Sequence, residues 1–146
     1  MKDSDVKYLV DTGPLVAHIN ASDRWHRWSR MALQSLDAPF YTTETVIAEA
    51  CYVLGNTRVA AASLTKAMVN GSLFVAPIYP DGQARINELL QKYENMDFAD
   101  ATLVVLSEQY PRAKLVTLDR RDFSVYRRHD GNPVPCIMPD ENSRAD

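Results

Sequence analysis

The order of the short apolar runs constrains the fold of this chain more than any other feature. Five such runs occur, none longer than six residues: YLVD (8–11), FYTT (40–43), LFVAPI (73–78), KLVTLD (114–119) and PCIMP (135–139). They are continuously apolar rather than alternating, which is typical of parallel strands that are covered on both faces. Because the runs alternate with helical segments, they predict an α/β domain with a mainly parallel sheet.

The segments between the runs have helical spacing, capping residues or both. We expect one helix that ends at Ile19 and others over residues 22–36, 44–54, 56–70, 81–93 and 97–110. Ser22 and Asp23 are expected to cap the second helix, and Gly71 to end the fourth. No internal repeat of fixed period occurs, and a length of 146 residues suits one domain. Its ordered core is predicted to span about 6–139, with 140–146 as a flexible tail.

Composition bears mainly on the cellular compartment. Cys51 and Cys136 have no metal-ligand spacing to another Cys or a His, and we expect both to be buried thiols, which suits a reducing compartment. The N-terminal stretch MKDSDVKY lacks the apolar core of a signal peptide. No apolar run approaches the roughly 18 residues of a membrane span. We therefore expect a cytoplasmic protein, and the net charge of −3 indicates no particular partner.

Two of the predicted strands end on an aspartate. Asp11 ends YLVD and Asp119 ends LVTLD. In α/β sheets, functional groups gather outside the carboxyl ends of the strands, near the point where the strand order reverses. If the first and fourth strands are neighbours, the two carboxylates face one crevice. The alternative is that each aspartate only caps the turn or helix after its strand.

Glu49 is the only charged residue in the run TVIAEACYVL. A charge that is buried without a partner is very costly, so this side chain must be exposed, paired or bound to a metal. The alternative to a site is a thin solvent-facing stripe that Glu49 shares with Thr45 and Tyr52. Because its helix follows the second strand, the early turns of that helix lie at the same edge of the sheet as Asp11.

The stretch YENMDFADATLVVL places Asp97 and Asp100 three residues apart before a buried helix. Asp97 suits the N-cap and Asp100 the third helical position, as in a capping box. Capping accounts for Asp97 better than for Asp100, because Asp100 lies at the mouth of a helix that we expect to be buried on most sides. The candidate site acids are therefore Asp11, Glu49, Asp100 and Asp119.

Four carboxylates in one place repel one another and raise each other's pKa. A divalent cation removes that repulsion, and Mg²⁺ and Mn²⁺ prefer carboxylate and water oxygens and bridge to phosphate. A cation held in this way can activate a water and stabilise the leaving oxygen in an attack on a phosphodiester. The residues thus predict Mg²⁺ or Mn²⁺ as the cofactor.

Four stretches of the chain carry a family resemblance: YLVDTGPLVA, TTETVIAEACYVL, MDFADATLVVLSEQY and LVTLDRRDF. Each is weak alone, but in this order and spacing, from about Tyr8 to Phe123, they resemble PIN-domain proteins, and most of all the VapC-type toxin ribonucleases of bacterial toxin–antitoxin systems. The resemblance implies a three-layer α/β/α fold with a five-stranded parallel sheet. It also implies a metal-dependent endoribonuclease.

The resemblance also implies roles for individual residues. The four family acids, which bind the metal and carry catalysis, match Asp11, Glu49, Asp100 and Asp119. Thr12 matches the hydroxyl residue that commonly follows the first acid. Asp97 and Asp122 are further acids near these positions and form a second tier of candidates.

The substrate side of the site is less defined. Residues 111–129 hold six basic residues and two acids, and a basic strip beside an acidic pocket suits a phosphate backbone. Arg120 and Arg121 are the candidate RNA-binding residues, with an ordinary solvated surface as the alternative. Trp25 and Trp28 could stack on bases, but their helical spacing favours core packing. No role is assigned to the three histidines.

The resemblance implies two protein partners. An antitoxin would cover the acidic pocket with a basic or aromatic segment, and a two-fold homodimer would form through residues 44–54 and 56–70, unless these simply close the monomer's core. The alternatives are a stand-alone PIN nuclease in RNA processing and a non-catalytic module that binds RNA or a partner. A P-loop is excluded, since no Gly-rich loop ends in Lys-Ser or Lys-Thr.

Overall fold

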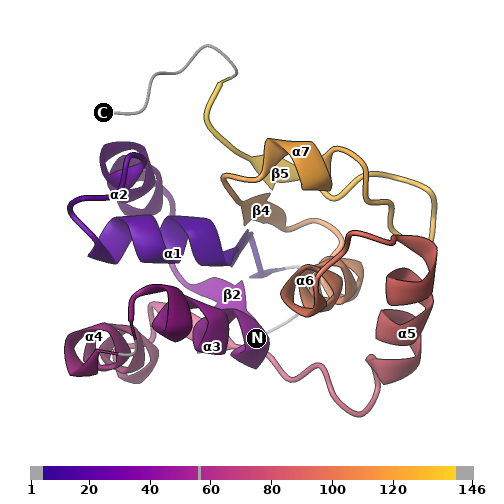
Figure 1. The fold of residues 1–146 in the computed structure, drawn as a ribbon, viewed down its shortest axis with the longest axis horizontal. Helices are drawn as coiled ribbons and strands as arrows, with labels where there is room; N and C mark the ends of the chain where they lie inside the picture. Colours follow the sequence, from indigo (N-terminus) through magenta and orange to yellow (C-terminus); the bar gives the residue numbers. More distant parts are fainter. Residues whose placement is uncertain (1–4, 56, 141–146) are drawn as a thin grey trace.

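The computed structural model describes residues 5–55 and 57–140 (Figure 1). Its core is a five-stranded parallel sheet in the order β3-β2-β1-β4-β5. The strands are β1 (Tyr8–Val10), β2 (Phe40–Thr42), β3 (Leu73–Val75), β4 (Lys114–Val116) and β5 (Cys136–Ile137). All five predicted strands are therefore present, each shorter than its apolar run.

Seven helices connect and cover these strands within the described part of the chain. They are α1 (Thr12–Ile19), α2 (His26–Ser35), α3 (Glu44–Val53), α4 (Arg58–Val69), α5 (Gln83–Lys92), α6 (Phe98–Gln109) and α7 (Arg120–Phe123). The short α7 was not predicted. The predicted start of the fourth helix at Asn56, and the predicted tail 140–146 except for Asp140, lie outside the described residues.

Helices cover both faces of the sheet, as the predicted three-layer α/β/α fold requires. Leu9 and Val10 are neighbours in β1, so their side chains point to opposite faces, and both are fully buried. Leu115 and Val116 in β4 are buried in the same way. Among the helices, α1 packs against α2 and α3, and α6 packs against α3 and α5 (Figure 1).

The helix α6 is the central helix of the fold. Its residues from Ala99 to Ser107 are all buried, which confirms the prediction that the helix after Asp97 is covered on most sides. Thr102 and Ser107 lie inside this buried stretch, and their hydroxyls donate to the backbone oxygens of Ala99 and Val104. This internal bonding lets polar residues occupy the buried stretch of α6.

Two local predictions are wrong. The second helix begins at His26 rather than after Ser22 and Asp23, because the Asp23 carboxylate accepts from the Trp25 N–H at 2.8 Å and forms a turn before the helix. The cysteines are free thiols but only half-buried, since Cys51 lies on a helix with an exposed side and Cys136 on an edge strand. No helix among the described residues is long and apolar enough to cross a membrane.

Candidate metal centre

The first and fourth strands are neighbours, as the site prediction required. Strands β1 and β4 pair in register from Tyr8 and Lys114, and the Asp11 N–H continues the ladder by donating to the Val116 oxygen at 3.0 Å. Asp11 and Asp119 therefore leave adjacent strands at the same carboxyl edge. They line a cleft of about 530 Å³ together with acids from α3, from the start of α6 and from the segment before α2: Asp23, Glu49, Asp97 and Asp100.

Three of these acids also cap helices. Capping and clustering in one cleft, which the sequence analysis treated as alternatives, therefore occur in the same residues. The Asp11 carboxylate accepts from the Thr12 N–H at 2.7 Å, Asp97 from the Asp100 N–H at 2.8 Å, and Asp119 from the Asp122 N–H at 3.0 Å. Each helix begins at the same edge of the sheet and presents unpaired N–H groups there. These dipoles offset part of the repulsion between the carboxylates.

Thr117 is a site residue that the sequence analysis missed. Its hydroxyl is fully buried, donates to Asp11 Oδ2 at 2.7 Å and accepts from the Asp119 N–H at 3.0 Å. One side chain thus fixes the positions of both strand-end acids. The signal was the hydroxyl residue in the run KLVTLD, two positions before Asp119.

Tyr126 is a second missed residue, and it holds Asp100. Its phenol donates to Asp100 Oδ2 at 2.9 Å, and the ring is almost completely buried. The Tyr126 ring packs edge-on against Phe123 and Tyr93, each with centroids 5.3 Å apart. No spacing in the sequence links Tyr126 to Asp100, because the contact joins α6 to the irregular segment after α7.

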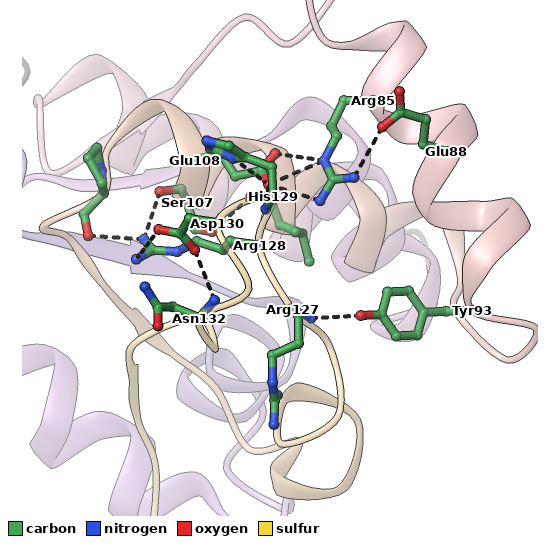
Figure 2. Close-up of polar contacts among 12 residues, drawn as sticks. Arg85, Glu88, Tyr93, Ser107, Glu108, Arg127, Arg128, His129, Asp130 and Asn132 are labelled. Carbon is green, nitrogen blue, oxygen red and sulfur yellow. Dashed lines mark hydrogen bonds and ion pairs between the residues drawn. The ribbon is translucent and has the colours of Figure 1, made fainter.

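A polar cluster fixes the segment that carries Tyr126 (Figure 2). Glu108 on α6 accepts from the backbone N–H of His129 at 2.6 Å and from Arg85 on α5 at 3.0 Å. Arg128 donates to the Pro111 oxygen at 3.0 Å, and the Arg127 N–H donates to the Tyr93 phenol at 2.9 Å. The segment that follows Tyr126 is therefore held against both α5 and α6.

The buried acids hold their protons more tightly than free carboxyl groups. Burial raises the pKa of Asp100 to about 8, and the charges of Asp11, Asp97 and Asp119 add to the rise. Burial raises the pKa of Asp11 to about 6, against the hydrogen bonds from Thr117 and Thr12 that lower it. Such a site is poised to exchange protons for a cation.

The donor set fits a hard divalent cation. One carboxylate oxygen each from Asp100, Asp119 and Asp122 lies within 4.8 Å of the others. Thr12 lines the same cleft, and its buried hydroxyl has no hydrogen-bond partner within the described residues, so it is available to a bound group. Oxygen donors alone, without thiol or imidazole, are the set that Mg²⁺ and Mn²⁺ prefer.

The candidate residues differ in burial and in their position relative to the cleft. Asp11 and Asp100 are buried, Glu49 reaches the cleft from α3 half-buried, and Asp122 joins Asp100 and Asp119 more closely than a second-tier position suggested. Arg120 and Arg121 are exposed on α7. Core packing was the wrong prediction for Trp25, which lines the acidic cleft because the turn at Asp23 places it before α2, whereas Trp28 packs against the core.

A second hollow lies elsewhere and differs in character. It measures about 470 Å³ and is mainly apolar, with walls from α1, α2, α4 and the strands β2 and β3. His18 is its only ionisable group among the described residues. The candidate metal-binding groups therefore lie in the acidic cleft rather than in this hollow.

This chain is an α/β domain whose acids gather at the carboxyl edge of a parallel sheet, in a cleft whose oxygen donors suit a divalent cation. The PIN domain family model matches residues 8–128. The chain belongs to the PIN domain family, which confirms the resemblance drawn from its four motifs.

Individual relatives agree with this assignment. The chain is 29% identical over 137 residues to Ribonuclease VapC26 of Mycobacterium tuberculosis, an alignment that covers 88% of this chain and 98% of the relative. Two solved structures share the fold. The Mycobacterium tuberculosis toxin VapC20, which cleaves the sarcin-ricin loop, has a TM-score of 0.64 at 19% identity, over 75% of this chain and 87% of that one.

The second structure is a toxin–antitoxin complex from Klebsiella pneumoniae. It has a TM-score of 0.63 at 21% identity and covers 92% of this chain and 99% of the matched chain. The similarity extends over nearly the whole length of both chains, so the described architecture, and not an isolated motif, is what the proteins share.

Proposed function

We propose that this chain is a metal-dependent endoribonuclease and the toxin of a toxin–antitoxin pair. The observation that carries the proposal is the cleft in which Asp11, Glu49, Asp100 and Asp119 converge from four separate segments. Membership of the PIN family and the similarity to a ribonuclease along almost all of that relative's length support it.

In this proposal, the acids divide into ligands and positioning groups. Asp100, Asp119 and Asp122 each place one carboxylate oxygen within 4.8 Å of the others, and Asp11 and Glu49 line the cleft that Asp100 and Asp119 also line. Mg²⁺ or Mn²⁺ bound there would supply Lewis acidity toward a phosphodiester and would activate a water. Thr117 and Tyr126 keep Asp11 and Asp100 in place, so the carboxylates need not reorganise when RNA binds.

RNA cleavage by the purified protein tests this proposal. We expect single-stranded RNA to be cut internally with Mg²⁺ or Mn²⁺ and to stay intact with EDTA. Asp11→Asn and Asp100→Asn should keep the fold, judged by circular dichroism, and lose cleavage. Metal-independent cleavage, or wild-type rates in either variant, would show that the acids do not form the active centre.

Two alternatives make different predictions. A stand-alone PIN nuclease would also cleave RNA but would have no partner that blocks it. A non-catalytic module would bind RNA and cleave none under any metal condition. The structural similarity to one chain of a toxin–antitoxin complex favours the toxin, and a small adjacent gene whose product abolishes cleavage would separate the toxin from the stand-alone enzyme.

The proposed antitoxin acts at the cleft itself. Six acids and one arginine line this hollow, so it attracts cations strongly. A basic or aromatic segment of the partner would lie among the carboxylates in place of the metal ion and would exclude RNA from the cleft. We propose that Arg120 and Arg121, which are exposed on α7, contact the RNA backbone. We also propose that the protein acts in the cytoplasm.

We also propose a two-fold homodimer that pairs through α3 and α4. Tyr52, Val53 and Val59 are 76%, 58% and 71% exposed on these helices. Val46, Ala50, Ala60 and Leu64, which were expected to contribute, are instead buried in the monomer's core. The proposed interface is accordingly smaller than the sequence suggested and centres on the exposed residues of the α3–α4 junction.

A further inference from the structure

A third hollow lies at the same edge of the sheet as the acidic cleft. This edge hollow measures about 390 Å³ and is lined by Thr43, Glu44, Thr45 and the segment 75–79. Thr43 directly follows β2 and Ala76 directly follows β3, so the hollow lies beyond the carboxyl ends of these strands. The acidic cleft lies beyond the ends of β1 and β4, and β2 pairs with β1. The two hollows are therefore neighbours along one edge.

One face of α3 runs from the edge hollow to the metal centre. Thr45 lines the edge hollow, and Glu49, four residues later, lines the acidic cleft. Residues four apart on a helix lie on the same face, with their Cβ atoms about 5–6 Å apart. The helix α6 packs against α3 (Figure 1). A ligand that is held in the cleft can therefore extend along α3 into the edge hollow.

Two exposed aromatic rings lie next to these hollows. Tyr79 lines the edge hollow, and Phe98, the first residue of α6, follows Asp97 of the acidic cleft. The two rings are stacked, with an interplanar angle of 17° and centroids 6.3 Å apart. At this offset each ring covers only part of the other, and each residue is 47% exposed. The pair thus leaves aromatic surface open to a ligand.

The backbone holds both rings in place. Ile78 is buried, and its oxygen accepts from the Gly82 N–H at 2.7 Å. A Cβ atom on Gly82 would lie 2.8 Å from that oxygen and 2.9 Å from Val105 Cγ1, so this turn packs closely on α6. Phe98 begins the helix that Asp97 caps. Because the surface is already ordered, a ligand that covers it loses little free energy to ordering the protein.

The charges around the edge hollow favour a base over a phosphate. Glu44 is the only charged side chain among the described residues that line it. A phosphate would be repelled there, whereas a nucleobase carries no charge. Every base has a flat π-face that stacks on aromatic side chains. The part of an RNA strand that suits this surface is therefore a base, while a cation in the acidic cleft attracts the phosphate.

We propose that Tyr79 and Phe98 form a stacking site for an unpaired base of the RNA substrate, beside the metal centre. A base can reach these rings only when it is unstacked from its neighbours, so the site selects a loop or an unpaired strand over a duplex. The proposal rests on the proposed RNA cleavage and adds a substrate subsite to it.

Binding measurements in an inactive background test the site separately from catalysis. In the Asp100→Asn variant, fluorescence anisotropy compares labelled oligoadenylate with an abasic strand of the same length. Adding Phe98→Ala should weaken binding of oligoadenylate by about 5- to 150-fold. Binding of the abasic strand should not change, because that strand keeps its phosphates and has no base to stack. Tyr79→Leu should act in the same direction.

Two further variants separate stacking from structural damage. Phe98→Tyr retains a ring and should recover most of the affinity. Phe74→Ala is the matched control, because Phe74 on β3 is also 47% exposed but lines neither the cleft nor the edge hollow. It should leave the affinity for both strands unchanged. Thermal denaturation identifies variants that misfold, and in the active protein Phe98→Ala should raise KM for single-stranded RNA more than it lowers kcat.

The outcomes distinguish failure of the stacking site from failure of the proposed function. If Phe98→Ala and Tyr79→Leu bind and cleave RNA as the wild type does, while Asp100→Asn has lost cleavage, the site is wrong and the nuclease assignment stands. Equal losses for oligoadenylate and the abasic strand, or a change in light-scattering mass with unchanged RNA binding, would also overturn the site. The second result would assign the rings to a protein interface. If the wild type neither binds nor cleaves RNA with Mg²⁺ or Mn²⁺, both proposals are wrong.

Discussion

At the scale of single residues, Asp97 and Asp100 separate a capping role from a site role. Asp97 caps α6 through its side chain, and Asn caps about as well as Asp. Asp97→Asn should therefore keep near-wild-type cleavage, and Asp97→Ala should lose about 0.5–2 kcal/mol of unfolding free energy. Asp100→Asn should lower the cleavage rate by more than the roughly 10- to 100-fold that is typical when a residue that only orients a metal ligand is removed. Equal loss of cleavage in Asp97→Asn and Asp100→Asn would move Asp97 among the metal-binding acids.

Tyr126 gives a second residue-scale prediction, because a single hydroxyl can be removed. Tyr126→Phe keeps the buried ring and deletes the donor to Asp100 Oδ2. We expect Mn²⁺ affinity, measured by isothermal titration calorimetry, to fall by about tenfold, as for other partners that orient a metal ligand. Tyr93→Phe is the control, since it removes a phenol from the packed neighbour without touching Asp100. The same fall in both variants would assign the effect to the segment and not to the hydroxyl.

At the scale of helices and strands, Glu108 controls how the segment after α7 is held. Its carboxylate is almost buried between Arg85 and His129, and their hydrogen bonds lower its pKa against the effect of burial. Glu108→Gln should cost about 1.5–3 kcal/mol of unfolding free energy in urea denaturation at neutral pH. The matched control is Glu88→Gln, which removes an exposed partner of the same Arg85 and should cost about 1 kcal/mol or less. Similar costs for the two variants would contradict a special role for Glu108.

The same scale shows how far the sequence determines this fold and its site. The strands and most helices follow from apolar runs and helical spacing, and Asp11 and Asp119 follow from the rule that parallel strands share a carboxyl edge. Tyr126 and Glu108 could not be predicted, because their contacts join segments that no periodicity relates. Trp25 was misjudged since helical spacing suggested the interior, while a turn made by Asp23 places it at the cleft.

At the scale of the whole molecule, the acid cluster makes stability depend on pH and on metal. An acid whose pKa is raised by folding binds its proton more tightly in the folded state. The stability of the protein therefore falls as the pH rises from the acid's pKa in the unfolded chain to its higher pKa in the folded protein. Because the pKa of Asp11 is about 6 and that of Asp100 is about 8, the metal-free protein should melt at a lower temperature at pH 8 than at pH 5. His18, whose pKa burial lowers, acts in the opposite direction.

Comparison with a variant isolates the contribution of the cluster. Asp100→Asn should flatten the decline in melting temperature between pH 5 and pH 8, because one buried charge and its repulsion with Asp11 are gone. Mg²⁺ or Mn²⁺ should raise the melting temperature of the wild type more at pH 8 than at pH 5, since the metal binds the deprotonated acids. A metal effect that does not change with pH, measured by differential scanning fluorimetry, would refute this account.

The proposed homodimer is the last property that belongs to the whole molecule. Tyr52 and Val53 at the end of α3 and Val59 at the start of α4 are large, mainly apolar side chains on either side of the α3–α4 junction, and exposing them to water is unfavourable. A two-fold contact would let each patch cover its own copy. Light scattering at micromolar concentration should therefore give about twice the chain mass of 16.5 kDa. Tyr52→Glu combined with Val59→Glu should shift the protein to monomer without unfolding it, since neither side chain is in the core. The control Val69→Glu, which changes a 90% exposed residue at the far end of α4, should remain dimeric. A wild-type mass of one chain that does not rise with concentration would mean that these residues face solvent in the working protein.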